Sequence, residues 1–230
     1  MKKLVVLTGS GISAESGLRT FREMGGLWEE YDVTEVASPE AWRNNPELVQ
    51  RFYNERRRQL STVEPNKGHI ALAQAEKDFE VIIITQNVDN LHERAGSTNI
   101  LHLHGELTKV RSTVDPDLIY DIGDRDLKMG DKCEKGSQLR PHIVWFGEAV
   151  PNIIPAAEIV SQADIFAVVG TSLNVYPAAG LLDYAPKGIP IFLVDPNVVP
   201  VYSRFDITFI QEPATVGVPK MMEKIKSKFN

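Results

Sequence analysis

The stretch Leu4-Val5-Val6-Leu7-Thr8-Gly9-Ser10-Gly11-Ile12-Ser13-Ala14 decides the fold of this 230-residue chain. An apolar run of strand length reaches Gly9, and Gly11 and Ala14 complete the pattern G-x-G-x-x-G/A. Glycine permits a tight turn and close backbone approach, and the following helix offers free N–H groups to a pyrophosphate. The stretch therefore predicts a phosphate-binding turn, although strand–glycine–helix turns also occur without a ligand.

The segment after this turn differs from that of a dehydrogenase. A dinucleotide-binding unit of the usual kind returns to a second strand that ends in Asp or Glu about 20 residues on. Here residues 18–28 have the composition of a loop, and Glu29 and Glu30 end no apolar run. Hydride transfer is therefore disfavoured.

Composition and charge set broad limits on the class of protein. Hydrophobic residues make up 43% and charged residues 24%, as in ordinary soluble domains. The formal net charge of −6 argues against broad binding to nucleic acid or anionic membranes. The apolar run at the N-terminus is too short for a signal peptide, and no stretch approaches the ~18 apolar residues of a membrane span. We expect a cytoplasmic, monomeric protein that binds neither nucleic acid nor membrane.

Alternating strand and helix patterns predict an α/β fold, a Rossmann-like parallel sheet with helices on both faces. The strands are expected near 4–9, 81–84, 100–103, 165–169, 189–194 and 205–210, and the helices at 46–60, 69–77, 90–95 and 218–229. Residues 109–140 are rich in charge and turn residues and predict a smaller inserted module. We assign 1–32, 61–108 and 141–230 to a large Rossmann-like domain, and 33–60 and 109–140 to insertions that form a small domain.

Five ordered blocks carry a resemblance to a known family. The run T-G-x-G-I-S-x-E-S-G-x-x-T-F-R from Thr8, followed by G-G-L-W, resembles the opening of the sirtuins, NAD-dependent protein deacylases. T-Q-N-V-D at 85–89, H-L-H-G at 102–105, F-G-E at 146–148 and G-T-S at 170–172 match the same family in order. The resemblance implies that NAD is a consumed co-substrate, that acyl-lysine proteins or peptides are the partners, and that the acyl group passes to ADP-ribose as nicotinamide leaves.

Polar residues at several strand ends fit an extended ligand such as NAD, because such ends gather at one edge of a parallel sheet. Any one of them could equally cap the next helix. With the resemblance, the predicted cofactor-binding residues are Gly9, Ser10, Gly11, Ile12, Ser13, Glu15, Thr20, Phe21, Arg22, Trp28, Gln86, Asn87, Val88, Asp89, His104, Gly170, Thr171, Ser172, Asp195, Asn197 and Ala214.

Histidine suits general-base work because its ordinary pKa lies near neutral pH. A structural role is the default for an arbitrary histidine, and it is our interpretation of His69 and His142. His104 precedes Gly105 as the catalytic histidine does in sirtuins, so the resemblance assigns catalysis to His104, with Asn87 placing ribose and water. His102, two residues away on the same strand face, is the alternative.

One face of the helix at 46–60 carries an unexpected charge. Helical periodicity puts Arg56 on the inward face with Tyr53, whereas Arg57 and Arg58 are expected at a solvated surface. Tyr53 and Arg56 resemble the Tyr-x-x-Arg pair of sirtuins that remove acidic acyl groups, which favours succinyl or malonyl over acetyl. A structural ion pair of Arg56 is the alternative. The predicted substrate-binding residues are Ala37, Tyr53, Arg56, Val144, Phe146, Gly147, Glu148, Asn174, Val175 and Tyr176.

The chain has one cysteine, Cys133, so it forms no disulfide within itself and has no four-cysteine zinc site. Sirtuins usually hold their small module with paired CxxC ligands, and the departure predicts a zinc-free module. Its expected small core is Val114, Leu118, Ile119, Tyr120, Ile122, Leu127 and Leu139. Two other functions remain open, an NAD-consuming ADP-ribosyltransferase and a non-catalytic sensor of NAD or ADP-ribose.

Overall fold

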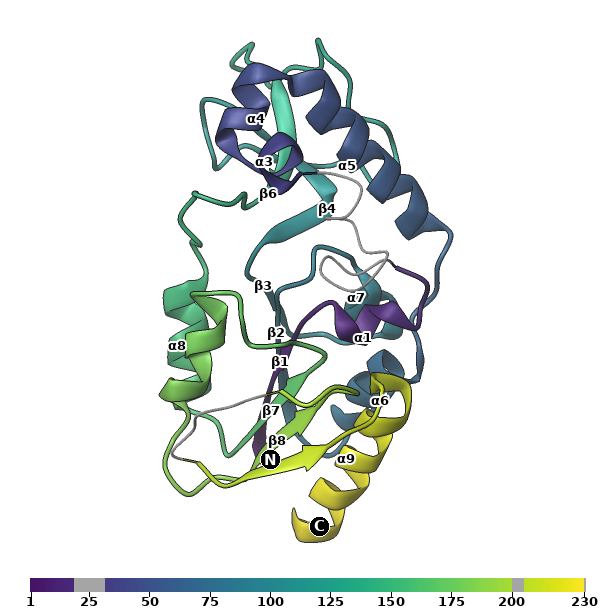
Figure 1. Ribbon diagram of the computed structural model, residues 1–230, viewed down its shortest axis with the longest axis vertical. Coiled ribbons are helices and arrows are strands. Elements are labelled where there is room, and N and C mark those ends of the chain that lie inside the picture. The colour runs from purple at the N-terminus through teal and green to yellow at the C-terminus, as the bar shows by residue number, and fades with distance from the viewer. Residues whose placement is uncertain (19–31, 200–204, 230) are drawn as a thin grey trace.

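A six-stranded parallel sheet forms the larger part of the molecule. The computed structural model describes residues 1–18, 32–199 and 205–229. The strands lie in the order β3-β2-β1-β7-β8-β9 and all pair in parallel (Figure 1). Their bounds are β1 Lys3–Thr8, β2 Glu80–Thr85, β3 Ile100–His102, β7 Ile165–Val169, β8 Ile191–Val194 and β9 Ile207–Ile210. The predicted Rossmann-like α/β fold is confirmed.

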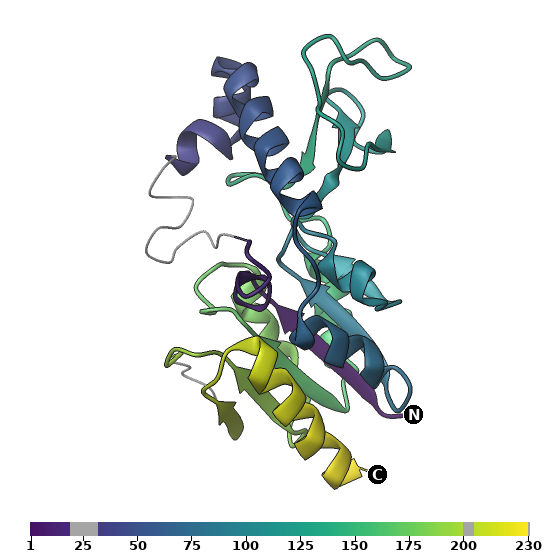
Figure 2. The ribbon, with the colours of Figure 1, turned by 90° about the vertical axis from the view of Figure 1, so that its right-hand side faces the viewer.

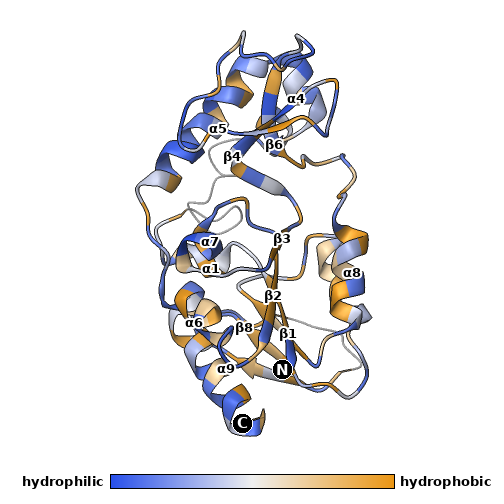
Figure 3. Ribbon diagram, turned by 180° about the vertical axis from the view of Figure 1, so that it is seen from behind, coloured by the Kyte–Doolittle hydropathy of each residue, from blue (hydrophilic) through white to orange (hydrophobic). Residues whose placement is uncertain are grey.

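Helices cover both faces of this sheet, which explains why its strands are apolar throughout. Alternate residues of a strand point to opposite faces. Leu4 and Val6 pack with α6 (Lys67–Ala75) and α9 (Ala214–Phe229), while Val5 and Leu7 pack with α8 (Ile153–Ser161) and the 3-10 helix η1 (Ala178–Tyr184). Figures 2 and 3 show α6 and α9 on the side opposite α8, with the hydrophobic strands between them. In the described part of the chain no helix has the length and apolar content to cross a bilayer.

A smaller unit lies beyond the carboxyl ends of the parallel strands (Figure 1). It combines an antiparallel sheet in the order β5-β4-β6 with three helices that share a hydrophobic cluster. The bounds are β4 Gly105–Ser112, β5 Ile119–Asp121, β6 Leu139–Ile143, α3 Val33–Val36, α4 Pro39–Asn44 and α5 Pro46–Ser61. The domain boundaries that we assigned stay a prediction.

Side-chain hydrogen bonds cap the starts of α4, α5 and α6. Helix α5 begins at Pro46 because the side chain of Asn45 caps the amide of Leu48, as the sequence suggests. The short helices α1 (Gly11–Ala14) and α7 (Leu91–Ala95) follow β1 and β2. The last helix begins at Ala214, four residues before the predicted start, and contains Pro219. Glu15 accepts hydrogen bonds from the amide and hydroxyl of Thr215, so one of the backbone N–H groups at the start of this helix has a partner.

Two expectations for the smaller unit are wrong. Arg57 is not at the surface but 1% exposed, with its Nε 2.7 Å from the carbonyl oxygen of Leu107. The reason is that α5 also packs against β4, which covers a second side of the helix. In the inserted module Val114 and Ile119 are 65% and 43% exposed, whereas Leu127 is buried. The module is small, and it docks through Leu127 onto α5 rather than enclosing a core of all seven predicted residues.

Candidate active site

A cavity of about 580 Å³ lies where the carboxyl ends of the parallel strands meet the smaller unit. This volume is typical of a site for a small-molecule ligand. Most of the predicted cofactor-binding residues line it, namely Gly9, Ser10, Gly11, Ser13, Gln86, Asn87, Val88, Asp89, His104, Gly170, Thr171, Ser172, Asp195 and Asn197. Residues far apart in the sequence therefore meet at one edge of the sheet, as parallel strands require.

Three predicted cofactor contacts among the described residues do not line the cavity. Ile12 and Ala214 are buried in the core on the α6/α9 side of the sheet, and the carboxylate of Glu15 is bonded to Thr215. These three residues therefore belong to the packing between the glycine turn and the helices α6 and α9. The others, Thr20, Phe21, Arg22 and Trp28, lie outside the described residues.

Gly9 and Gly11 allow the turn after β1 to lie in close contact with the chain at the end of β7. The amide of Gly9 donates to Val169 O at 3.0 Å, and that of Gly11 to Gly170 O at 2.9 Å. A Cβ at Gly9 would lie 2.7 Å from Gly170 O, and one at Gly11 would lie 2.7 Å from Gly170 Cα. These two amides are thus used within the protein, and the phosphate-binding role that we expected of the following helix start stays a prediction. Glycine is needed here because the turns after β1 and β7 interlock.

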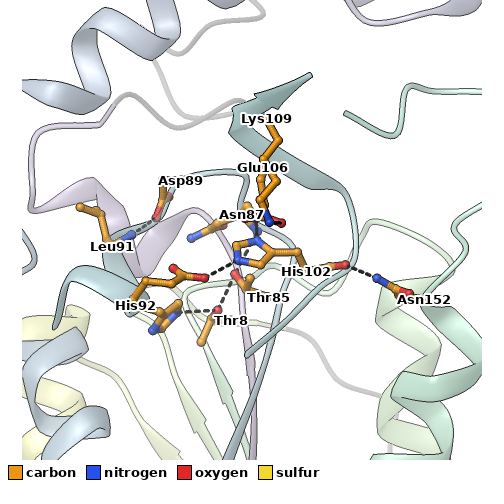
Figure 4. Close-up of polar contacts among 11 residues, drawn as sticks. Thr8, Thr85, Asn87, Asp89, Leu91, His92, His102, Glu106, Lys109 and Asn152 are labelled. Carbon is orange, nitrogen blue, oxygen red and sulfur yellow. Dashed lines mark hydrogen bonds and ion pairs between the residues drawn. The ribbon is translucent and has the colours of Figure 1, made fainter. Parts of the chain in front are cut away.

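Buried polar bonds hold Asn87 and Asp89 at the cavity, and Figure 4 shows one of them, from the amide of Leu91 to the Asp89 carboxylate. The amide nitrogen of the Asn87 side chain donates to Gly9 O and to Ser13 Oγ, both at 3.1 Å. The Ser13 hydroxyl donates in turn to Asp89 Oδ2 at 3.0 Å. Burial raises the pKa of Asp89, although the amide of Leu91 and the Ser13 hydroxyl oppose this shift by bonding the carboxylate. Asn87 and Asp89 therefore present rigid hydrogen-bonding groups to a ligand.

His104 has the state that a general base needs. Its Nδ1 lies 3.0 Å from the main-chain oxygen of Gln86. A carbonyl oxygen only accepts, so Nδ1 carries the proton and Nε2 keeps its lone pair. Burial lowers the pKa of His104 against the opposing effect of the Gln86 contact, so the ring is neutral at pH 7. A neutral imidazole at the cavity wall can take a proton from a hydroxyl group.

The other histidines lie outside the cavity lining. Burial lowers the pKa of His69 and of His142 to about 4, so both are neutral and suit structural roles. His69 also receives the amide of Asn66 and completes the cap of α6. His102, the alternative base, turns its Nε2 to Glu93 at 2.7 Å rather than to the cavity.

The wall formed by the smaller unit carries the predicted acyl-binding residues. Ala37, Tyr53 and Arg56 all line the cavity, and Arg56 is half-buried. The indole Nε1 of Trp145 donates to the Tyr53 hydroxyl oxygen at 3.1 Å. Burial raises the pKa of Tyr53, so its phenol keeps a proton that it can donate. The sequence did not suggest several lining residues, namely Leu18, Phe52, Leu107, Trp145, Val150, Pro177, Val198 and Val199. Most of them are apolar, so their sequence pattern indicates a place in the core rather than at a ligand site.

The predicted peptide-binding segments lie at the same cavity. It is lined by Val144, Phe146, Gly147, Glu148, Asn174, Val175 and Tyr176. Glu148 is not open to a peptide charge, because its carboxylate accepts from Arg140 at 2.7 Å and from the amide of Trp145 at 2.8 Å. The Arg140 guanidinium also lies 3.3 Å from the centre of the Trp145 ring. Glu148 therefore holds the loop that carries Phe146 and Trp145.

These features define a class of protein. The chain is an α/β protein with a cavity at the carboxyl edge of its parallel sheet, where ligands bind in such folds, and His104 at that cavity suits general-base chemistry. Comparison with known proteins makes this class specific. The profile of the Sir2 family matches residues 9–177, and the chain belongs to that family.

Individual relatives and solved structures match this chain over nearly its whole length. Proteins named NAD-dependent protein deacylase from Bacteroides thetaiotaomicron and Helicobacter pylori are 55% and 53% identical, with 97% and 98% of both chains covered. A solved complex of a Sir2 homologue with NAD is 38% identical, with a TM-score of 0.88 over 100% of this chain and 91% of that one. A Sir2 protein with a deacetylated p53 peptide and 3′-O-acetyl ADP-ribose is 30% identical, with a TM-score of 0.82 and coverage of 96% and 92%.

Proposed function

We propose that this Sir2-family chain removes succinyl and malonyl groups from protein lysines, with NAD as co-substrate, in preference to acetyl groups. NAD-dependent protein deacylation is the activity named for its curated relatives. The finer proposal concerns which acyl group the chain prefers. The observation that carries it is that Tyr53 and Arg56 line the same cavity as His104.

The residues at the strand ends have separate tasks in this chemistry. NAD supplies an electrophilic ribose carbon from which nicotinamide departs, and the acyl oxygen of the substrate attacks it. Asp89 is suited to hydrogen-bond the nicotinamide carboxamide, and Asn87 to place ribose and water. His104, neutral and with Nε2 unprotonated, accepts the proton of a ribose hydroxyl as that oxygen attacks the acyl carbon.

The cavity wall that carries Tyr53 and Arg56 suits an acyl group that ends in a negative charge. Arg56, on α5, lines the cavity together with the apolar side chains of Phe52, Leu107 and Trp145. An arginine at this wall can bind the carboxylate of a succinyl or malonyl group through two parallel N–H donors. The proton of the Tyr53 hydroxyl adds a donor, because the indole of Trp145 occupies an oxygen lone pair. An acetyl group offers neither donor an acceptor.

The test compares succinyl-, malonyl- and acetyl-lysine forms of one peptide by kcat/KM. Arg56→Met removes the charge and keeps most of the length of the side chain. A hydrogen bond to a charged group contributes about 1.5–3 kcal/mol, so turnover of the two acidic substrates should fall about 10- to 100-fold. Deacetylation should change less than about threefold. Tyr53→Phe should have a smaller effect in the same direction.

Arg51→Met is the matched control, because Arg51 is an exposed arginine on the same helix. It should leave all three rates unchanged. The proposal fails if Arg56→Met alters succinyl and acetyl turnover equally, since Arg56 would then support the fold rather than the acyl group.

A further inference from the structure

The loop that carries Asn87 is held by its main-chain carbonyls. Residues 86–88 follow β2, and each of their three carbonyl oxygens accepts a hydrogen bond from the chain that runs from β3 into β4. The pairs are His104 Nδ1 with Gln86 O at 3.0 Å, His102 Nδ1 with Asn87 O at 3.2 Å, and Leu107 N with Val88 O at 2.8 Å. Two of the three donors are imidazole rings, so side chains at 102 and 104 determine how this loop sits.

Both ring nitrogens of His102 have acceptors. Nδ1 faces the Asn87 carbonyl, and Nε2 lies 2.7 Å from Glu93 Oε1. Neither a carbonyl nor a carboxylate oxygen donates, so both nitrogens carry protons and the ring is an imidazolium ion. The His102 side chain is 9% exposed and that of Glu93 is 40% exposed. The positive charge is thus almost buried, and Glu93 on α7 balances it.

The surrounding charges favour this state. Burial opposes the charged ring, but the hydrogen bond and negative charge of Glu93, with Glu106 further away, raise the pKa of His102. Lys109 pairs with Glu106 at 2.8 Å. Ligand atoms of Glu93, His102 and Glu106 lie within 4.8 Å of one another in the described part of the chain, but a cation there would need the lone pair of Nε2. The proton shared with Glu93 already occupies that position.

We propose that His102 and Glu93 form a positioning dyad for Asn87: the His102 ring, held by Glu93, donates to the main-chain oxygen of Asn87 and fixes the side chain of Asn87 at the cavity. This role rests on the proposed deacylase chemistry, in which Asn87 places ribose and water. His102 is not among the residues that line the cavity, so it acts through Asn87.

The bonds of Asn87 explain why this contact reaches the cavity. Its amide N–H donates to Thr85 Oγ1 at 3.0 Å, its carbonyl accepts from His102, and its side-chain nitrogen donates to Gly9 and Ser13. Its Oδ1 is left as the polar atom with no partner among the described residues, and Asn87 lines the cavity. A shift of the Asn87 main chain therefore moves the one acceptor that Asn87 offers a ligand.

Three substitutions at one position separate the two hydrogen bonds of His102. Asparagine places an amide nitrogen where the imidazole has Nδ1, so His102→Asn retains the donor to Asn87. Glutamine places it where the ring has Nε2, so His102→Gln retains the donor to Glu93 only. His102→Ala removes both. Nicotinamide release is measured with one acyl-peptide, with kcat and peptide KM determined separately, and NAD affinity is measured by calorimetry.

The dyad predicts a specific order of activities. His102→Gln and His102→Ala should lower kcat about tenfold or more with little change in peptide KM, while His102→Asn stays within about threefold of the unaltered protein. Glu93→Gln should fall between them. NAD affinity should follow the same order, so the dyad is tested even where turnover is absent. His142→Asn and His142→Gln, made at a histidine outside the cavity lining, should leave kcat unchanged.

Either of two results would overturn the dyad. One is that all three His102 variants lose kcat and thermal stability together, which indicates general structural support. The other is that folded His102→Gln and His102→Ala keep full kcat and NAD affinity. Failure of the proposed function is distinguishable, because unaltered protein would then release no nicotinamide with any acyl-peptide.

Discussion

The indole Nε1 of Trp145 lies 3.1 Å from the hydroxyl oxygen of Tyr53, and the two side chains are 2% and 5% exposed. An indole N–H only donates, so Tyr53 must accept this bond and direct its own proton elsewhere. Glu148 and Arg140 fix Trp145 in turn, through its amide and its ring. The orientation of the Tyr53 hydroxyl is therefore set by Trp145, and indirectly by Glu148 and Arg140.

Replacing Trp145 by Phe keeps a large ring and removes the donor. The Tyr53 hydroxyl can then rotate, so turnover of succinyl-lysine should fall about 3- to 10-fold, the worth of about one neutral hydrogen bond. Acetyl-lysine turnover should stay within about twofold. Trp42→Phe is the matched control, because the Trp42 ring packs 5.8 Å from that of Trp145. Equal losses with both substrates in Trp145→Phe would assign Trp145 to packing alone.

The pH dependence of turnover should report His104. The base is active when neutral, and burial lowers its pKa below the ordinary value of 6.5. As the pH falls, kcat/KM should therefore persist below pH 6.5 and decline only as the ring becomes protonated. His104→Ala should abolish release of the acyl product at every pH. An acid limb centred at or above pH 6.5 would contradict the environment described for this ring.

Arg57 should contribute to stability although it lies outside the cavity. Its guanidinium donates to Leu107 O and Asn54 Oδ1, both at 2.7 Å, and burial lowers its pKa to about 10, so it stays charged at pH 7. Arg57→Met leaves those oxygens buried without this donor and should cost about 2–4 kcal/mol in the free energy of unfolding. Arg58→Met, which removes an exposed pair with Asp126, should cost less than about 1 kcal/mol. Equal costs in denaturant unfolding would refute this difference.

The inserted module should fold without zinc. Cys133 is the only cysteine of the chain, and its sulfur lies 3.1 Å from Ser137 Oγ and 3.4 Å from Ser112 Oγ. The module is also tied to α5, where Asn54 pairs with both the amide and the carbonyl of Leu127 at 2.9 Å. A chelator should leave the melting temperature unchanged. One equivalent of tightly bound zinc, measured on protein purified without a metal column, would count against this prediction.

The parallel sheet was predictable because its signal is local. Runs such as 81–84 and 165–169 are apolar at every position, as strands covered on both faces must be. The polar residues at the ends of these runs then fall at one edge for geometric reasons. The glycine pattern was recognisable too, but the sequence could not show that the Gly9 and Gly11 amides pair with the carbonyl oxygens of Val169 and Gly170. Those bonds join segments about 160 residues apart.

Arg57 and Trp145 show what periodicity missed. Gln50, Asn54 and Arg57 form a second buried stripe on α5, but their polar side chains resemble a solvated face in sequence. Trp145 stands between two predicted contacts, Val144 and Phe146. In an extended strand it would face away from them, but β6 ends at Ile143 and the amide of Glu148 turns back to Trp145 O. Both misses depend on tertiary contacts that no local pattern encodes.

The most direct test of the proposed deacylation follows the fate of NAD. Purified protein is incubated with NAD and a succinyl-lysine peptide, and mass spectrometry measures nicotinamide, free lysine peptide and acyl-ADP-ribose. We expect equal amounts of all three products, formed faster than the corresponding products from the acetyl-lysine peptide. Nicotinamide release with ADP-ribose attached to protein, or no release with any acyl-peptide, would contradict it.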